Sequence, residues 1–170
     1  FCALFLDRYL LKLKTLQFNF KSSAIAVQFL QGQWLAEKNI QLAVLRLDLM
    51  HPFVSGNKWF KLKYNLEEAK KQNKKTLLTF GGAWSNHLAA TAFACRREGF
   101  KSIGIIRGEK PPALNPTLKN LEQQGMYLQF ISRREYDREK NDPAYREELY
   151  QQFGSVYIIP EGGHNENGIK

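Results

Sequence analysis

The stretch Thr76-Leu77-Leu78-Thr79-Phe80-Gly81-Gly82-Ala83-Trp84-Ser85-Asn86-His87 decides the fold of this chain. It runs from an apolar segment of strand length through two glycines to three polar residues. The Ala-rich segment 88–98 then follows a helical pattern, which Gly99 ends. Two glycines allow a tight turn, and the first amides of a helix can bind an anion. The stretch therefore predicts a strand that turns sharply into a helix, with a candidate anion site at the turn.

Strand-like and helical segments continue to alternate along the rest of the chain. Apolar runs of strand length occur at 102–107, 126–131 and 156–160, and helical segments begin at Asn115-Pro116 and span 143–153. Apolar strands separated by helices of crossover length indicate βαβ units. We therefore predict an α/β fold, in which a three-layer, twisted and mostly parallel sheet carries helices on both faces.

Two glycine-rich turns are expected at one edge of this sheet. Ligands of open parallel sheets bind beyond the carboxyl ends of the strands. Segments 81–87 and 161–165 each follow a predicted strand, so both are expected at that edge. The segment 132–141 is so rich in charge that we expect it to be a solvated excursion.

The N-terminal third is less regular. Residues 1–22 show no clear period and are treated as peripheral. The pattern predicts a short helix over 30–38 and a strand over 40–47, which Pro52 follows as a breaker. From Lys58 onward, apolar residues recur at helical spacing, which predicts a helix.

Composition and charge disfavour several classes of protein. The formal net charge is +9, but the 25 basic residues are spread among acidic ones, which disfavours nucleic-acid binding and suits an anionic cofactor or substrate. Two cysteines, Cys2 and Cys95, favour neither a disulfide framework nor a zinc site, and they indicate a cytoplasmic location. The apolar start is too short to span a membrane and does not resemble a signal peptide, and no membrane partner is expected. The first residue is not Met, which indicates a partial sequence.

Lys58 is the first candidate for chemistry. It follows Ser55-Gly56-Asn57, a turn that lets the backbone approach a ligand and supplies polar contacts. A lysine held and partly desolvated in this way can form a Schiff base with a carbonyl cofactor. Lys61 lies one helical turn further on and could reach a phosphate. The alternative for both is an ordinary solvated lysine on a helix surface.

Ser85, Asn86 and His87 form the second candidate group. At the helix start they could bind a substrate carboxylate, with Asn86 near a cofactor ring and Ser85 donating or relaying a proton. The alternative is plain capping of the helix by Ser85 or Asn86. A Ser/His hydrolase is disfavoured, because there is no Gly-x-Ser-x-Gly motif and His87 follows Ser85 too closely. His51, His164 and Glu161 do not have metal-ligand spacing, so no metal site is predicted.

Five segments together resemble the 1-aminocyclopropane-1-carboxylate deaminase / D-cysteine desulfhydrase family, which are pyridoxal-phosphate enzymes of the tryptophan-synthase-β fold, also called fold type II. The resemblance runs from about Ile25 to the end. It is carried by Leu47-Asp48-Leu49-Met50-His51-Pro52, Ser55-Gly56-Asn57-Lys58-Trp59, Lys61-Leu62-Lys63-Tyr64-Asn65-Leu66, Leu77-Leu78-Thr79-Phe80-Gly81-Gly82-Ala83-Trp84-Ser85-Asn86-His87 and Ile105-Ile106-Arg107-Gly108-Glu109.

The resemblance implies a role for each candidate residue. Lys58 would be the catalytic Schiff-base lysine, with Asn57 as a further cofactor-binding residue beside it and Lys61 near the cofactor phosphate. Asn86 would lie beside the ring hydroxyl, and Ser85, a second catalytic residue, would contact the substrate together with Asn86 and His87. The chain departs from the family pattern at Phe60, where arginine is usual, and at Arg46-Leu47-Asp48, where Arg-Asp-Asp is usual.

The resemblance also implies a reaction and a missing half. The reaction would be that of a lyase or hydrolase acting on a small amino acid, either desulfhydration of D-cysteine to pyruvate, ammonia and sulfide or deamination of 1-aminocyclopropane-1-carboxylate. The full-length protein would be a homodimer. Family members continue past Gly162-Gly163 with a second phosphate-binding loop, so this chain is expected to be an N-terminal fragment, inactive alone. Residues 23–75 would belong to the large cofactor-binding domain, 76–160 to the small domain, and 161–170 to the return toward the large one. The alternative function is a non-catalytic remnant or binding domain of this fold.

Overall fold

The computed structural model describes residues 26–51, 53–139 and 142–169, which fall into two units divided between Gly56 and Asn57. The prediction for residues 1–22 lies outside the described residues. The assignment of 23–75 to a large domain, 76–160 to a small one and 161–170 to the return between them stays a prediction. Each unit is described below by itself.

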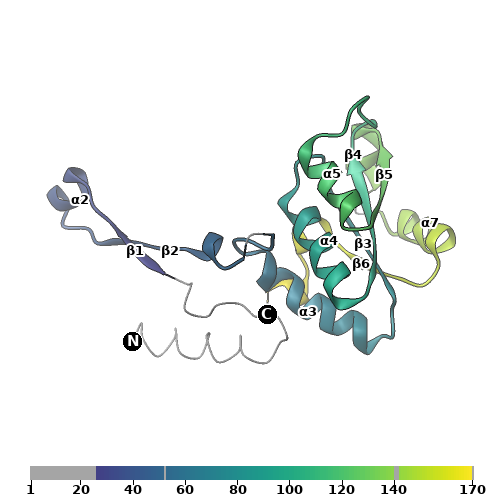
Figure 1. Ribbon diagram of the computed structural model, residues 1–170, viewed down its shortest axis with the longest axis horizontal. Helices are drawn as coiled ribbons and strands as arrows, with labels where there is room; N and C mark the ends of the chain where they lie inside the picture. The colour runs from purple at the N-terminus through teal and green to yellow at the C-terminus, as the bar shows by residue number, and fades with distance from the viewer. Residues whose placement is uncertain (1–25, 52, 140–141, 170) are drawn as a thin grey trace. The chain divides into compact units, whose positions relative to one another are not determined.

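The second unit is built on a parallel sheet of four strands (Figure 1). The strands are β3 (Thr76–Gly82), β4 (Lys101–Arg107), β5 (Met126–Ile131) and β6 (Val156–Ile159). Their order is β5-β4-β3-β6, and every neighbouring pair is parallel. The predicted parallel sheet is therefore confirmed, and β3 at its centre carries the stretch that was expected to decide the fold.

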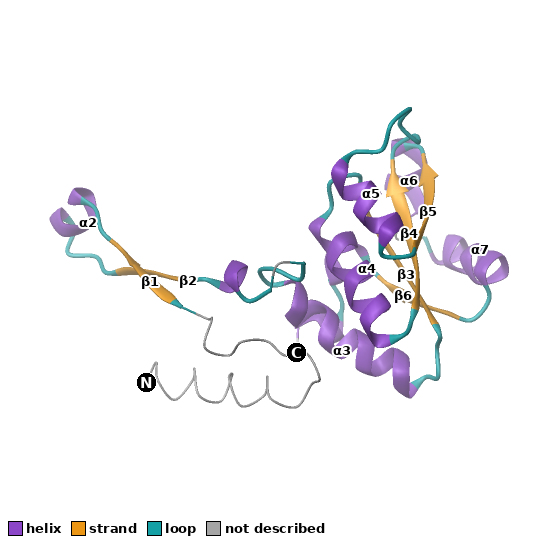
Figure 2. Cartoon of the chain, viewed as in Figure 1, coloured by secondary structure: helices purple, strands orange, loops and turns teal. Residues whose placement is uncertain are grey.

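Helices cover both faces of the sheet, which confirms the predicted three layers (Figure 2). On one face, buried side chains of α4 (Asn86–Glu98) and α5 (Pro116–Gln123) pack against Ile106 and Met126. On the other face, α6 (Arg133–Glu139) and α7 (Pro143–Phe153) pack against Leu78, Phe80 and Ile105. The remaining helices of this unit are α3 (Lys58–Lys71), the short 3-10 turn η3 (Glu161–Gly163) and α8 (Glu166–Ile169).

The ends of these helices follow from local sequence. Asn115 and Asp142 each cap a helix that has proline in its first turn, and their side chains accept hydrogen bonds from Leu118 N and Ala144 N. Gly99 ends α4 with a φ of 75°, a conformation that glycine adopts without strain. These signals are local, which is why the sequence predicts them well.

The expectation of a solvated excursion over 132–141 is only partly correct for its described part, where Arg133, Arg134, Glu135 and Asp137 are exposed. Residues 133–139 form α6, and Tyr136 is fully buried in the core, where its ring meets that of Phe80 edge-on at 6.2 Å. The pKa of the Tyr136 hydroxyl is raised, mainly by burial and to a smaller extent by the charge of Glu161. A single aromatic residue therefore anchors an otherwise charged helix beside the turn at Glu161.

Replacing Tyr136 by alanine is expected to destabilise the protein by about 3–5 kcal/mol, because it removes a fully buried aromatic side chain and leaves a cavity. Tyr127→Ala on β5 is the control, since Tyr127 is 58% exposed, and we expect it to cost less than about 1 kcal/mol. Urea unfolding measures both. Equal losses for the two variants would contradict the anchoring role of Tyr136.

The first unit contains a β-hairpin. Strand β1 (Val27–Leu30) pairs antiparallel with β2 (Leu42–Leu45), and α2 (Gln33–Glu37) lies between them in the chain. The predicted strand over 40–47 is thus present but shorter, and the predicted helix over 30–38 begins later because Leu30 still belongs to β1. All eight strand residues are exposed. Beyond β2, the 3-10 turn η2 spans Leu47–Leu49. Arg46 and Asp48 flank Leu47 in the segment that departs from the family pattern. They form an ion pair with an N–O distance of 2.7 Å.

Candidate functional site

Three segments that are far apart in the sequence meet at the carboxyl edge of the central sheet. They are the first turn of α3, the turn and helix start after β3, and the glycine turn after β6. Gly163 marks the meeting point, because a Cβ placed on it would lie 3.0 Å from Lys61 Cβ and 3.4 Å from His87 Cε1. Its φ of 70° also favours glycine. A side chain at this position would fill the space between α3 and α4.

Lys58 is the first residue of α3 and is partly buried. Its amine donates a hydrogen bond to Asn57 Oδ1 at 3.0 Å. Partial burial, followed by the positive charge of Lys61, lowers the pKa of the Lys58 amine. A lower pKa increases the share of neutral amine, which is the nucleophilic form. Asn57 is exposed, and its side chain serves Lys58 instead of capping the helix.

Ser85 and Asn86 stand at the start of α4. Ser85 is the N-cap residue, and its Oγ accepts a hydrogen bond from Leu88 N at 3.3 Å. The capping role that the sequence left open is therefore realised, but it uses only a lone pair and leaves the hydroxyl proton available to donate. Asn86 is exposed as the first residue of the helix.

Gly81 explains how Ser85 comes to fold back against β3. A Cβ placed on Gly81 would lie 2.7 Å from Ser85 Oγ and 2.9 Å from Leu88 Cγ. Any larger residue would push the Ser85 side chain out of its place. The glycine thus sets the position of the serine as well as the tightness of the turn.

His87 is buried, unlike its two polar neighbours in the chain. Its Nε2 lies 2.9 Å from Thr79 Oγ1, and the Thr79 hydroxyl donates to the carbonyl of Ile159 at 2.9 Å. Burial, followed by the charges of Lys58 and Lys61, lowers the pKa of His87 to about 3. The imidazole is therefore neutral at physiological pH. Its Nδ1 is buried and has no hydrogen-bond partner in the part of the chain that the structure describes.

A group of amides that the sequence did not single out fixes the glycine turn against α3. Asn65 is fully buried, donates to the Lys61 carbonyl at 2.7 Å and exchanges two hydrogen bonds with the amide of Asn165, at 3.1 and 2.8 Å. The Tyr157 hydroxyl donates to Asn65 Oδ1 at 3.1 Å. Two signals were available, because Asn65 lies in one of the segments that carry the family resemblance and is a polar residue on the apolar stripe of a predicted helix.

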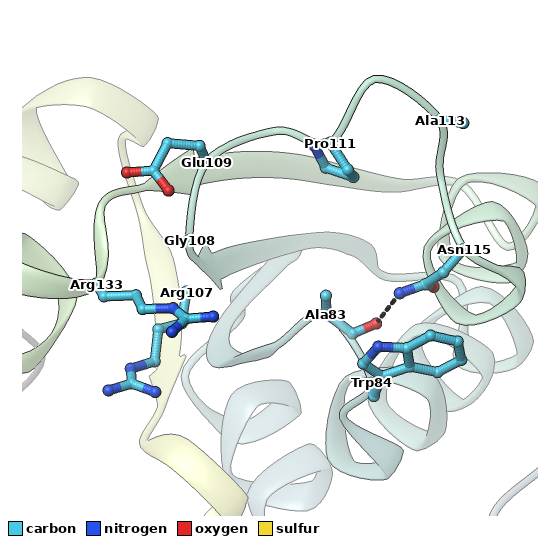
Figure 3. Close-up of a pocket in the computed structure, with 9 residues that line it drawn as sticks. All are labelled: Ala83, Trp84, Arg107, Gly108, Glu109, Pro111, Ala113, Asn115 and Arg133. Atoms are coloured by element: carbon cyan, nitrogen blue, oxygen red, sulfur yellow. Dashed lines mark hydrogen bonds between the residues drawn. The ribbon is translucent and has the colours of Figure 1, made fainter.

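A cavity of about 370 Å³ lies at the neighbouring strand ends. Figure 3 shows Arg107 and Arg133 at one side of it and Trp84 and Asn115 at the other. Asn115 Nδ2 donates to Ala83 O at 3.0 Å, and Arg107 forms an ion pair with Asp137 at 2.7 Å. The cavity adjoins the Ser85 turn through Ala83 and Trp84. Its remaining lining residues are Gly108, Glu109, Pro111 and Ala113.

The structure thus brings Lys58, Lys61 and His87 into one neighbourhood, with Ser85 and Asn86 at the adjoining helix start. Among the described residues, no group of three or more His, Cys, Asp or Glu side chains is placed to hold a metal ion. No helix within the same residues is both long enough and apolar enough to cross a bilayer. The roles assigned to the individual residues remain predictions.

Known proteins are similar to most of this chain. A putative 1-aminocyclopropane-1-carboxylate deaminase of Thermotoga maritima is 40% identical over 145 residues, which cover 84% of this chain and 45% of that protein. A bifunctional D-cysteine desulfhydrase/1-aminocyclopropane-1-carboxylate deaminase of Arabidopsis thaliana, described as mitochondrial, is 34% identical over 136 residues, which cover 75% of this chain and 34% of that protein. No family model matches the chain.

The fold has a solved counterpart. The crystal structure of a homologue of 1-aminocyclopropane-1-carboxylate (ACC) deaminase superposes on this chain with a TM-score of 0.69. The two are 25% identical, and the match covers 85% of this chain and 44% of the other. The likeness agrees with the α/β fold class predicted from the sequence. The chain spans less than half the length of the relatives that it matches.

Proposed function

We infer that this chain, which is related over most of its length to the 1-aminocyclopropane-1-carboxylate deaminase and D-cysteine desulfhydrase proteins, is part of a pyridoxal-phosphate-dependent enzyme of that family. The enzyme would act as a lyase or deaminase on a small amino acid. The observation that carries this proposal is the Lys58 amine, which has a lowered pKa and lies at the carboxyl edge of the sheet beside Lys61 and His87. The names of the relatives do not support the hydrolase class.

The residues at this edge fit pyridoxal phosphate. Lys58 offers an amine for covalent attachment, and Lys61 offers a positive charge for the phosphate group. Gly162 and Gly163 have positive φ values, and the space that a Cβ on Gly163 would fill lies directly beside Lys61. Asn57 contacts the Lys58 amine, and Asn86, at the start of α4, would supply a second polar group for the cofactor. The cofactor, when bound, supplies an electron sink for charge that develops on the substrate's α carbon.

The start of α4 is suited to hold the substrate carboxylate. The amides of Leu88 and Ala89 already donate to Ser85. The amides of Asn86 and His87 are the other two of the first turn, where the helix dipole favours an anion. The Ser85 hydroxyl can donate a further hydrogen bond to the same carboxylate. This arrangement would orient a small amino acid toward Lys58, whose neutral amine can accept a proton.

Turnover by the complete protein tests the reaction class. D-Cysteine should release sulfide and ammonia with pyruvate, and 1-aminocyclopropane-1-carboxylate should release ammonia with a 2-oxo acid. The described residues do not favour one of these substrates over the other. A homodimeric state and a cytoplasmic location are further parts of the proposal, and gel filtration and cell fractionation test them.

The rival function is a non-catalytic remnant or binding domain of the same fold. A remnant would not form a stable covalent adduct with pyridoxal phosphate. A yellow colour that borohydride bleaches, present in the complete protein after removal of free cofactor, would support the enzyme and exclude the remnant.

Ser85→Ala is expected to lower kcat/KM by about 10²-fold while cofactor affinity changes less than about threefold, because the hydroxyl would contact the substrate and not the cofactor. Titration with pyridoxal phosphate and steady-state kinetics measure the two effects. The lost helix cap should also lower stability by about 1 kcal/mol. Ser132→Ala is a control, since it removes an N-cap hydroxyl that bonds Glu135 N at 3.3 Å, away from the site. Loss of cofactor binding with normal turnover per bound cofactor would contradict the proposed role.

A further inference from the structure

The hydrogen bonds around Thr79 determine which nitrogen of His87 carries the proton. The Thr79 hydroxyl is fully buried on β3 and has a single proton, which it donates to the carbonyl of Ile159 at 2.9 Å. Its contact of 2.9 Å with His87 Nε2 must therefore be one that the hydroxyl oxygen accepts. It follows that Nε2 carries the proton of the neutral imidazole.

The opposite assignment leaves more buried groups without partners. If Nε2 were the acceptor, the Thr79 hydroxyl would have to turn away from the Ile159 carbonyl. Nδ1 would then hold a buried N–H with no acceptor among the described residues. Buried polar groups without partners are strongly disfavoured. The Nε2–H form leaves only one lone pair unused, on Nδ1.

That lone pair belongs to a ring that lies in the candidate site. The ring edge at Cε1, next to Nδ1, lies 3.4 Å from the position a Cβ on Gly163 would take, and Lys58 and Lys61 both act on the ring through their charges. A neutral acceptor can take a hydrogen bond from the amine of a ligand without pairing with it as an ion.

We propose that Thr79 is a positioning residue, which fixes His87 as the Nε2–H tautomer and so keeps Nδ1 as a buried hydrogen-bond acceptor for an amine in the site. That amine is the amino group of the substrate when it is bound. The inference about the substrate rests on the proposed function, whereas the tautomer itself does not.

Nitrogen NMR of the ¹⁵N-histidine-labelled complete protein, free of cofactor, tests the tautomer directly. The chain has three histidines, and the His87→Asn variant identifies the signal of His87. We expect a proton on Nε2, none on Nδ1, and no titration from neutral pH down to mildly acidic pH. Thr79→Ser should keep this pattern, and Thr79→Val should change it. A proton on Nδ1, a charged ring at neutral pH, or an unchanged pattern in Thr79→Val would overturn the proposal.

A double-mutant cycle separates positioning from a purely structural effect. Thr79→Val is expected to lower kcat by roughly tenfold in the unmodified protein but by less than about twofold in the His87→Asn background, with rescue by Thr79→Ser. Equal losses in both backgrounds would show that Thr79 acts through the fold alone and would overturn the proposal. If neither substrate is turned over, the proposed function fails, while the NMR comparison still decides the tautomer.

Discussion

Lys58→Ala in the complete protein is expected to abolish the absorbance band of tightly bound pyridoxal phosphate and to lower turnover by at least about 10²-fold. The reason is that Lys58 combines a lowered pKa with a fixed place at the start of α3, where its amine bonds Asn57 at 3.0 Å. Alanine keeps the helix and removes the amine. Absorption spectroscopy after desalting and steady-state kinetics measure the two losses.

Lys71→Ala is the matched control for this experiment. Lys71 lies in the last turn of the same helix, its side chain is 75% exposed, and its ion pair with Glu68 is long, at 4.0 Å. Surface pairs of this kind contribute little to stability. We expect this variant to keep both the band and turnover. A normal band and normal turnover in Lys58→Ala would contradict the assignment.

Residues 1–170 produced alone are expected to be inactive and to self-associate. The hairpin exposes a row of apolar side chains, and exposed apolar surface of this kind favours association. These residues are Val27, Phe29, Leu30, Trp34, Ile40, Leu42, Val44 and Leu45. The proposed cofactor site would also have few amides for the phosphate, so the gain from orienting the substrate would be small.

Light scattering during gel filtration and a sulfide assay measure these properties. Phe29→Glu should reduce self-association, because Phe29 is 67% exposed on β1. Trp84→Glu is the control, since Trp84 is 69% exposed but lies in the sheet unit. A monomer with turnover comparable to that of a full-length relative would contradict both expectations.

The parts of the fold that local sequence dictates were predicted well. The run of β3 into α4, the proline-capped starts of α5 and α7 and the glycine end of α4 depend on residues within a few positions of one another. Strand β1 and helix α6 are among the parts that were not predicted. Strand β1 depends on pairing with β2 across an intervening helix, and α6 depends on one buried residue, Tyr136, in a charged segment. Both rest on contacts that a local pattern does not contain.

The candidate site was also predicted only in part. Turns and helix starts mark four of its residues in the sequence, namely Lys58, Ser85, Asn86 and His87. Thr79, which we propose as a positioning residue, was not predicted, because one of its two hydrogen bonds goes to a carbonyl 80 residues away. Asn65 was missed for a similar reason, since its partner Asn165 lies 100 residues further on.

The central claim is that Lys58 holds the cofactor, and peptide mapping tests it most directly. The complete protein is incubated with pyridoxal phosphate and reduced with borohydride, which makes the bond between cofactor and amine permanent. It is then digested and analysed by mass spectrometry. We predict a single strongly modified peptide, with the cofactor on Lys58. Modification mainly at Lys61 or another lysine, or weak modification spread over many lysines, would contradict the account.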